Sequence, residues 1–363
     1  MGRLFAKKEN TFMRSIYAFM ALLLFAGAAF AQNLPKFSGL MFGDYYYLAQ
    51  DHVPSQNNMQ AFEYRRIYLT AHYNITNDFW ARMRLESDPT ASNLGNGKLS
   101  TWVKDAFIDW HNPIPNSDLI IGLQGTWNIN FAEPLFGYRP LEKTIQDLHG
   151  ISASRDLGVS LTERFTHEFS AGLLVGNNSG NSGGLYPDNA NGTPTNLDPS
   201  FRYKSAYLFL DYTVNGFTVY LDGQYSGEPD QKDISTGDLI LNYKTKTYSI
   251  GVQGFVNTVA KSNPDGSNLN RNGISFNGWV TLVKDLNLVG RYDIYDGNSD
   301  KTYQNVTLGS NQFLYCTQNF LMAALDYKVN DHVHFMPNLE YTTYGVSGSK
   351  PDVMYRVTYY FDF

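Results

Sequence analysis

The sequence predicts an all-β protein, a transmembrane antiparallel β-barrel of about 16 strands with short periplasmic turns and long extracellular loops. Three observations predict it: apolar and polar residues alternate along many short segments, the connectors alternate between short and long, and the last segment is an amphipathic aromatic strand. Only 17% of the 363 residues are charged, fewer than in soluble domains. This excludes disordered, nucleic-acid-binding and coiled-coil proteins. A single cysteine excludes a disulfide framework.

Residues 1–31 have the pattern of a secretory signal peptide. Basic residues precede an apolar run at 16–30, which ends in small residues, and we expect cleavage near Ala31. A membrane anchor is the alternative, although the run is short for a spanning helix. Removing the peptide takes away four basic residues and one acidic residue, so the net charge falls from −6 to −9. A net-negative exported chain is a poor candidate for binding nucleic acid.

The remaining chain, residues 32–363, alternates with a period of two. In the segment 66–73, for example, Ile67 and Leu69 are apolar, while Arg66 and Thr70 on either side of them are polar. Such alternation is typical of strands with one apolar and one polar face. We therefore place strands at 36–50, 61–75, 78–88, 101–111, 117–127, 156–164, 167–176, 202–213, 216–226, 237–245, 246–257, 273–284, 285–296, 312–329, 332–344 and 351–363.

The connectors of this arrangement fall into two classes. Those after even-numbered strands are short, and Asn215-Gly216 is a signal for a type I′ turn. Those after odd-numbered strands include long polar segments such as 177–200, 260–272 and 297–311. Outer-membrane barrels have this asymmetry, whereas a secreted β-sandwich, the alternative, would not sort its connectors by strand parity.

The C-terminal strand predicts how the barrel is assembled and where it resides. Tyr359, Phe361 and Phe363 share its apolar face, and we expect them to form the assembly signal that the barrel assembly machinery reads. Since only helices and closed barrels can span lipid, we expect the bacterial outer membrane as the location and its lipid as a partner. Aromatic residues near strand ends fit two interfacial girdles: Tyr45, Tyr47, Tyr73, Trp110, Trp127, Tyr212, Tyr225, Tyr341 and Tyr359.

The sequence resembles the phosphate-selective porin O/P family in its N-terminal third and in its final strand. The segments of the N-terminal third that carry the resemblance are 37–46, 62–69, 103–110 and 119–124. The resemblance implies a 16-stranded, usually trimeric porin that passes phosphate or other anions past arginines and lysines in its lumen. The charges of this chain depart from that pattern, because both signs occur on the inferred lumenal face, which gives weak selectivity.

The residues predicted to line the pore are charged and lie on the polar faces of strands. They are Arg66, Arg82, Arg84, Glu86, Asp105, Asp109, Arg164, Arg291, Asp293 and Arg356, and the same faces carry Asp211, Asp222 and Glu340. Alternatively, about half of these arginines pair with carboxylates across strands and fill the lumen.

The connector 128–155 is the candidate constriction loop. Leu141, Ile145 and Leu148 follow Pro140 at helical spacing and Gly150 closes the segment, which predicts a helix packed on the inner wall. An external loop, packed on its neighbours or at a trimer interface, is the alternative. The residues expected at the constriction are Glu133, Arg139, Glu142, Lys143 and Asp147.

These features together predict a porin for passive diffusion of small hydrophilic solutes or ions, with an anion bias from Arg66, Arg82 and Arg84. We expect no enzymatic activity, no cofactor and no metal, and a homotrimer is possible for such a barrel. A plugged structural or adhesive barrel is the first alternative. A barrel hydrolase is the second, although the sequence has no G-x-S-x-G or H-E-x-x-H motif.

Overall fold

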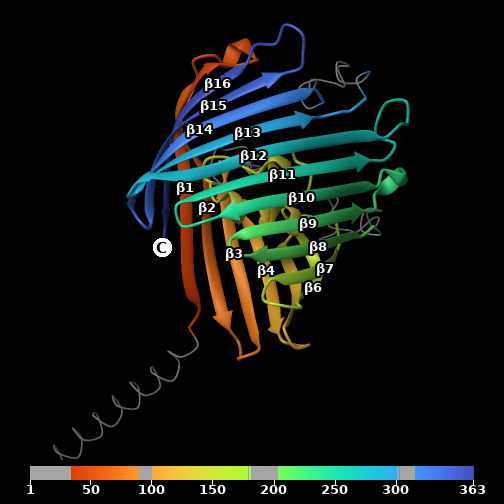
Figure 1. Ribbon diagram of the computed structural model, residues 1–363. Coiled ribbons are helices and arrows are strands. Elements are labelled where there is room, and N and C mark those ends of the chain that lie inside the picture. The colour runs from red at the N-terminus through yellow and green to blue at the C-terminus, as the bar shows by residue number, and fades with distance from the viewer. Residues whose placement is uncertain (1–33, 90–99, 179, 181–202, 301, 303–314) are drawn as a thin grey trace, which may run out of the picture.

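The computed structural model describes residues 34–89, 100–178, 180, 203–300, 302 and 315–363. In these residues 16 antiparallel strands form a closed barrel in which each strand pairs with its sequence neighbours and β1 pairs with β16 (Figure 1). The first eight are β1 (Lys36–Gln50), β2 (Gln60–Asn74), β3 (Phe79–Asp88), β4 (Ser100–His111), β5 (Ser117–Gly125), β6 (Arg155–Arg164), β7 (Phe169–Gly176) and β8 (Ser205–Val214). The others are β9 (Phe217–Ser226), β10 (Ile234–Lys244), β11 (Tyr248–Val259), β12 (Leu269–Val283), β13 (Leu286–Asp296), β14 (Thr317–Asn330), β15 (Val333–Tyr344) and β16 (Asp352–Asp362).

The predicted fold class and strand order are confirmed. Each predicted strand overlaps one observed strand in the same order, and the boundaries shift by a few residues in either direction, because hydrogen-bonded pairing lengthens strands such as β12 and ends others, such as β5, early. Asn215 and Gly216 have φ angles of 50° and 83°, the positive values that a type I′ turn requires. The signal peptide and most of the segments 177–200 and 297–311 lie outside the described residues.

The two faces of the barrel differ in chemistry. Large apolar side chains such as Phe62, Ile250 and Val256 are exposed on the outer face, whereas the inner face buries polar residues such as Asp44, Glu86 and Asn257. A continuous apolar outer surface of this size would be unstable in water but is suited to lipid. None of the described helices has the length and apolar character needed to cross a membrane.

Two β-bulges, one on β2 and one on β4, change the strict alternation of inward and outward residues. The β1–β2 register passes from Phe42↔Arg66 to Gly43↔Tyr64, so Arg65 is an extra residue. The β3–β4 register likewise skips Lys104 beside Asp105. Because a bulge places two consecutive residues against one partner, Arg65 and Lys104 both contribute side chains to the inner face.

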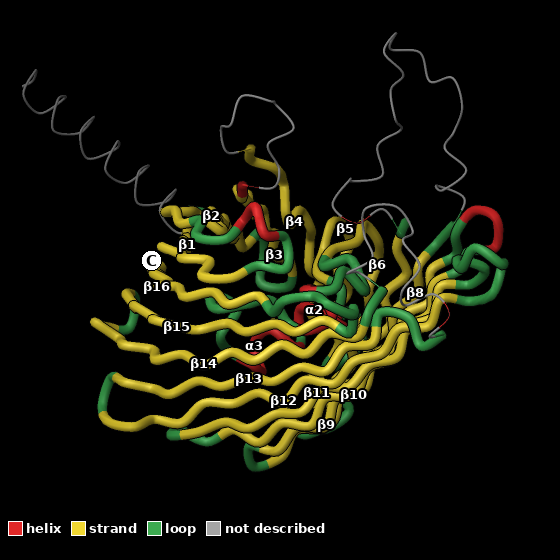
Figure 2. The backbone as a smooth tube through the Cα atoms, turned by 90° about the horizontal axis from the view of Figure 1, so that it is seen from above, coloured by secondary structure: helices red, strands yellow, loops and turns green. Residues whose placement is uncertain are grey.

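The connector after β5 folds into the barrel (Figure 2). It contains three short helices, α2 (Trp127–Asn130), α3 (Ala132–Phe136) and α4 (Ile145–Leu148), which contact β8, β9, β11 and β12. The helix predicted to begin at Pro140 is therefore wrong in extent, because it forms only at α4.

Trp127 was expected in an outer girdle, which is also wrong: β5 ends early, and Trp127 packs on Phe209 within the barrel at a ring distance of 4.6 Å. Two 3-10 turns, η1 (Pro54–Gln56) and η5 (Pro229–Gln231), lie in other connectors.

Candidate functional site

The inward loop, residues 126–154, is tied to the wall by hydrogen bonds at widely separated strands. Arg65 of β2 donates to the carbonyl oxygens of Pro140 and Leu141 at 2.9 and 2.7 Å. Tyr138 donates its hydroxyl proton to Asp326 of β14 at 3.0 Å, while Asn287 of β13 donates to that hydroxyl at 2.9 Å. The loop is thus held from both sides of the lumen.

Apolar contacts hold the loop as well. Leu141 and Ile145 are fully buried and belong to two separate clusters against the inner wall. The ring of Phe131 stacks on Tyr220 of β9 with centroids 3.7 Å apart. Burying two large aliphatic side chains contributes about 1.5–3 kcal/mol each, so the loop is a packed element inside the barrel.

Glu142 is the electrostatic centre of this attachment. Its carboxylate lies 3.4 Å from Arg65 and 3.3 Å from Arg356 of β16, and Arg356 also pairs with Glu340 at 2.8 Å. Burial alone would raise the pKa of Glu142, but the two guanidinium groups and the backbone N–H of Lys143 lower it below its usual range. Glu142 is therefore an anion that joins the loop to β2 and β16.

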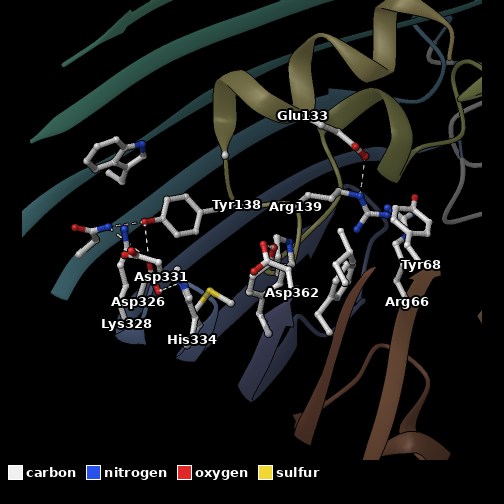
Figure 3. Close-up of a pocket in the computed structure, with 18 of the residues that line it drawn as sticks. Arg66, Tyr68, Glu133, Tyr138, Arg139, Asp326, Lys328, Asp331, His334 and Asp362 are labelled. Atoms are coloured by element: carbon white, nitrogen blue, oxygen red, sulfur yellow. Dashed lines mark hydrogen bonds and ion pairs between the residues drawn. The ribbon is translucent and has the colours of Figure 1, made fainter. Parts of the chain in front are cut away.

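Between the loop and the short turns lies a cavity of about 570 Å³. Figure 3 shows Arg66 and Tyr68 on one side of it, Tyr138, Asp326, Lys328 and His334 on the other, and Glu133 and Arg139 from the loop between them. The basic lining residues are Arg66, Arg84, Arg139, Lys244, Lys246 and Lys328. The acidic ones are Glu133, Asp326, Asp331 and Asp362.

Three of these arginines lie over aromatic rings. Arg66 is 5.0 Å and Arg84 4.6 Å from the ring centre of Tyr68, and Arg139 is 5.9 Å from that of Phe42. Contacts of this kind stabilise a guanidinium and fix its orientation. The arginines therefore present fixed positive charges to one side of the cavity.

Behind them, buried carboxylates on β3 and β4 are surrounded by cations. Glu86 lies 2.7 Å from Arg66 and 2.8 Å from Lys104. Asp105 pairs with Arg155 and lies 3.6 Å from Arg84 and 3.7 Å from Arg82. This basic wall, formed by Arg66, Arg82, Arg84, Lys104 and Arg155, holds more positive groups than the two carboxylates neutralise.

The structure does not bring all predicted pore residues together. Arg291 and Asp293 are buried and pair with each other at 2.5 Å, and Arg291 also donates to the loop carbonyl of Lys143. Arg164 is half exposed at the end of β6 near the short turns, where it pairs with Asp118. Asp109 is buried at that same end, 3.8 Å from His111.

The predicted loop residues also separate into two groups. Glu133 and Arg139 line the cavity and pair at 2.8 Å. Asp147 lies 3.5 Å from Arg139 and 3.9 Å from the partly exposed Lys143, whereas Glu142 is buried. Sequence reasoning missed Arg65 and Lys104, and the doublets Arg65-Arg66 and Lys104-Asp105 are the signal of a bulge that could have found them.

The residues predicted to form the assembly signal lie on the outward face at the end of the chain, where β16 pairs with β1 and closes the barrel. Phe363 forms two backbone hydrogen bonds with Gly39 of β1, at 3.0 and 3.1 Å, and its ring is exposed. Phe361 is exposed too, while Tyr359 donates to the carbonyl oxygen of Glu63 at 3.0 Å. The last strand thus completes the closed sheet.

Two clusters in the described residues have the composition of a metal site, and each places a histidine between carboxylates. They are Asp51, His52 and Asp352 near the long loops, and Asp109, His111 and Asp118 near the short turns. His52 already bonds Asp352 at 2.9 Å, and Asp118 already bonds both His111 at 2.6 Å and Arg164. The internal bonds account for the geometry of both clusters.

No protein-family model matches this sequence, and no curated protein sequence matches it. Its fold is similar to an anion-selective porin from Comamonas acidovorans (TM-score 0.64, 10% identity, 91% of this chain and 100% of that chain). It is also similar to the outer membrane channel DcaP of Acinetobacter baumannii (TM-score 0.63, 9% identity, 91% and 97%). A third similar structure is OmpF of Salmonella typhi (TM-score 0.61, 12% identity, 91% and 98%). The chain therefore has the closed 16-stranded barrel fold that outer-membrane porins share.

Proposed function

We propose that this protein is an outer-membrane porin for passive diffusion of small hydrophilic solutes, with a bias toward anions. The observation that carries the proposal is the cavity beside the basic wall, where Arg66 and Arg84 face the space with rings behind them. Fixed charges at a narrow point select ions through their electrostatic potential. The inward loop then acts as the constriction, with Glu133 and Arg139 at its edge.

The location and assembly belong to the same proposal. The signal peptide is cleaved near Ala31, the barrel assembly machinery inserts the chain through its C-terminal strand, and three copies associate in the outer membrane. The aromatic outer face supports a lipid environment. Phosphate selectivity, as in the O/P family that the sequence resembles, is a narrower form of the anion bias. Diffusion of this kind needs no cofactor and no covalent chemistry.

A planar bilayer experiment tests the function. Purified protein should give stepwise currents, and its reversal potential in a potassium chloride gradient should show chloride to be more permeant than potassium. Equal permeabilities would remove the anion bias but leave the porin. Absence of steps would favour a plugged structural barrel, because the loop is held on several strands. Ester hydrolysis by the purified protein would instead favour the hydrolase.

Assembly is tested separately. Unboiled protein should migrate anomalously on SDS gels, and removal of Phe363 should reduce the folded fraction in cells, since its backbone pairs with Gly39. Deletion of the same length at Leu34 in the mature N-terminus is the control. Equal assembly of both variants would contradict the role of the terminal residue.

A further inference from the structure

The inner face of β9 and β10 carries a pair of aspartates behind the inward loop. Asp222 and Asp238 are direct cross-strand partners, and Asp238 is only 4% exposed. Side chains of cross-strand partners lie about 4.5–5.5 Å apart at Cβ. Two carboxylates are thus held side by side in a covered part of the lumen.

These carboxylates have no cationic partner among the described residues. Both oxygens of Asp222 and Oδ1 of Asp238 lack a hydrogen-bond donor there, while the other oxygen of Asp238 accepts from Gln253 at 3.0 Å. Like charges directly opposite each other destabilise a sheet, and burial strengthens the repulsion. A bound cation or a shared proton would relieve this repulsion, and the described side chains supply no cation.

Two neutral side chains point to the same place. Gln146 of α4 and Tyr220 of β9 are both completely buried, and the carboxamide of Gln146 reaches toward Asp238. The carbonyl oxygen of Gln146 and the Tyr220 hydroxyl have no hydrogen-bond partner among the described residues. Buried polar groups are normally satisfied, so four side chains share an unmet need for a partner.

The donor set identifies the partner. Asp222, Asp238, Gln146 and Tyr220 offer oxygen atoms, and the set includes no sulfur or imidazole ligand. Oxygen-only sets with two carboxylates suit hard divalent cations, and calcium tolerates irregular geometry with carboxylates binding through one or two oxygens. We propose that Asp222 and Asp238, with Gln146 from the loop, bind a calcium-like divalent cation.

This cation site would fasten the loop to the barrel wall. Gln146 lies in the loop, and Phe131 of the loop stacks on Tyr220 beside the carboxylates. An ion bound between them joins α4 to β9 and β10 on the side opposite the Glu142 contacts. The inference rests on these residues and is independent of whether the barrel conducts ions.

The test measures Ca²⁺ binding to the full mature protein, refolded in detergent without lipopolysaccharide and stripped with EDTA. Isothermal titration should show one saturable site, and Asp222→Asn and Asp238→Asn should each weaken it at least tenfold. Asp118→Asn and Asp352→Asn, one in each carboxylate–histidine cluster, are the matched controls and should keep the site. Anomalous migration on SDS gels establishes that every variant is folded.

A variant in the loop provides a second test of the site in case the strand variants do not fold. Gln146→Leu leaves the strands unchanged and should also weaken Ca²⁺ binding. The proposal is overturned if the native protein binds no Ca²⁺ at millimolar concentration, or if Asp222→Asn and Asp238→Asn bind as the native protein does. Stabilisation by Asp222→Asn without any Ca²⁺ effect would likewise overturn it, and would show that the aspartates share a proton.

Discussion

Two walls of the same barrel bury carboxylates in opposite surroundings. On β3 and β4, Glu86 and Asp105 are enclosed by arginines and a lysine at 2.7–3.7 Å. On β9 and β10, Asp222 and Asp238 face each other without a described cation. The comparison teaches that an inward carboxylate has no fixed role. Its role depends on the side chains of the neighbouring strands: beside arginines and lysines it neutralises positive charge, and beside another carboxylate it adds to a negative charge that remains to be neutralised.

The largest difference between the walls should appear in stability. Glu86→Gln would leave Arg66 and Lys104 buried beside each other without their anion, which should cost about 3–5 kcal/mol. Asp222→Asn removes a like-charge repulsion and should cost nothing in EDTA. Urea titration of the folded barrel in lipid vesicles measures both. Equal losses of stability in the two variants would contradict the difference in pairing.

The next largest difference between the two walls should appear in ion selectivity. Arg84→Glu should lower the permeability ratio of chloride to potassium by about tenfold, because reversing a charge near the ion path changes its energy by about 1–2 kcal/mol. Arg84→Gln should give an intermediate shift. Asp222→Asn should leave the reversal potential unchanged because the loop covers it. A shift with Asp222→Asn as large as that of Arg84→Gln would refute this assignment of the ion path.

The loop attachment at Glu142 should give a pH dependence. Since the folded-state pKa of Glu142 is lowered from 4.5, its contribution to stability is fully present above about pH 4.5 and is lost as the pH falls through the lowered value. Current noise from loop movement should thus rise only in strong acid. Recording in EDTA excludes loss of a bound cation, and Glu142→Gln should abolish the acid-dependent part.

The smallest effect should come from the neutral attachment at Tyr138. Tyr138→Phe removes its hydrogen bonds with Asp326 and Asn287 but keeps the ring in its apolar cluster. We expect a loss of about 1 kcal/mol in unfolding free energy and unchanged ion selectivity. Phe131→Leu, at the attachment on β9, is the matched comparison for loop noise. A change in selectivity with Tyr138→Phe would mean that this hydroxyl acts on the permeating ion.

The strands and the faces of most charged residues could be predicted from the sequence. Arg66, Arg84 and Glu86 follow a period of two, and this period is a local property of the chain. Arg65 and Lys104 could not be placed in this way, because a bulge depends on the register with the neighbouring strand. The helix that the sequence predicts from Pro140 is longer than the observed α4, since Leu141 and Ile145 pack into different clusters of the wall.

By itself, then, the sequence determined an all-β barrel with 16 strands, its turn asymmetry and the chemistry of its two faces, because alternation and turn residues act within a few positions of the chain. Only the tertiary structure decided which buried charges meet. Glu142 joins Arg65 to Arg356 across 291 positions of sequence, and Gln146 meets Asp238 only because the loop turns inward. Such contacts depend on closing the sheet, which no local pattern encodes.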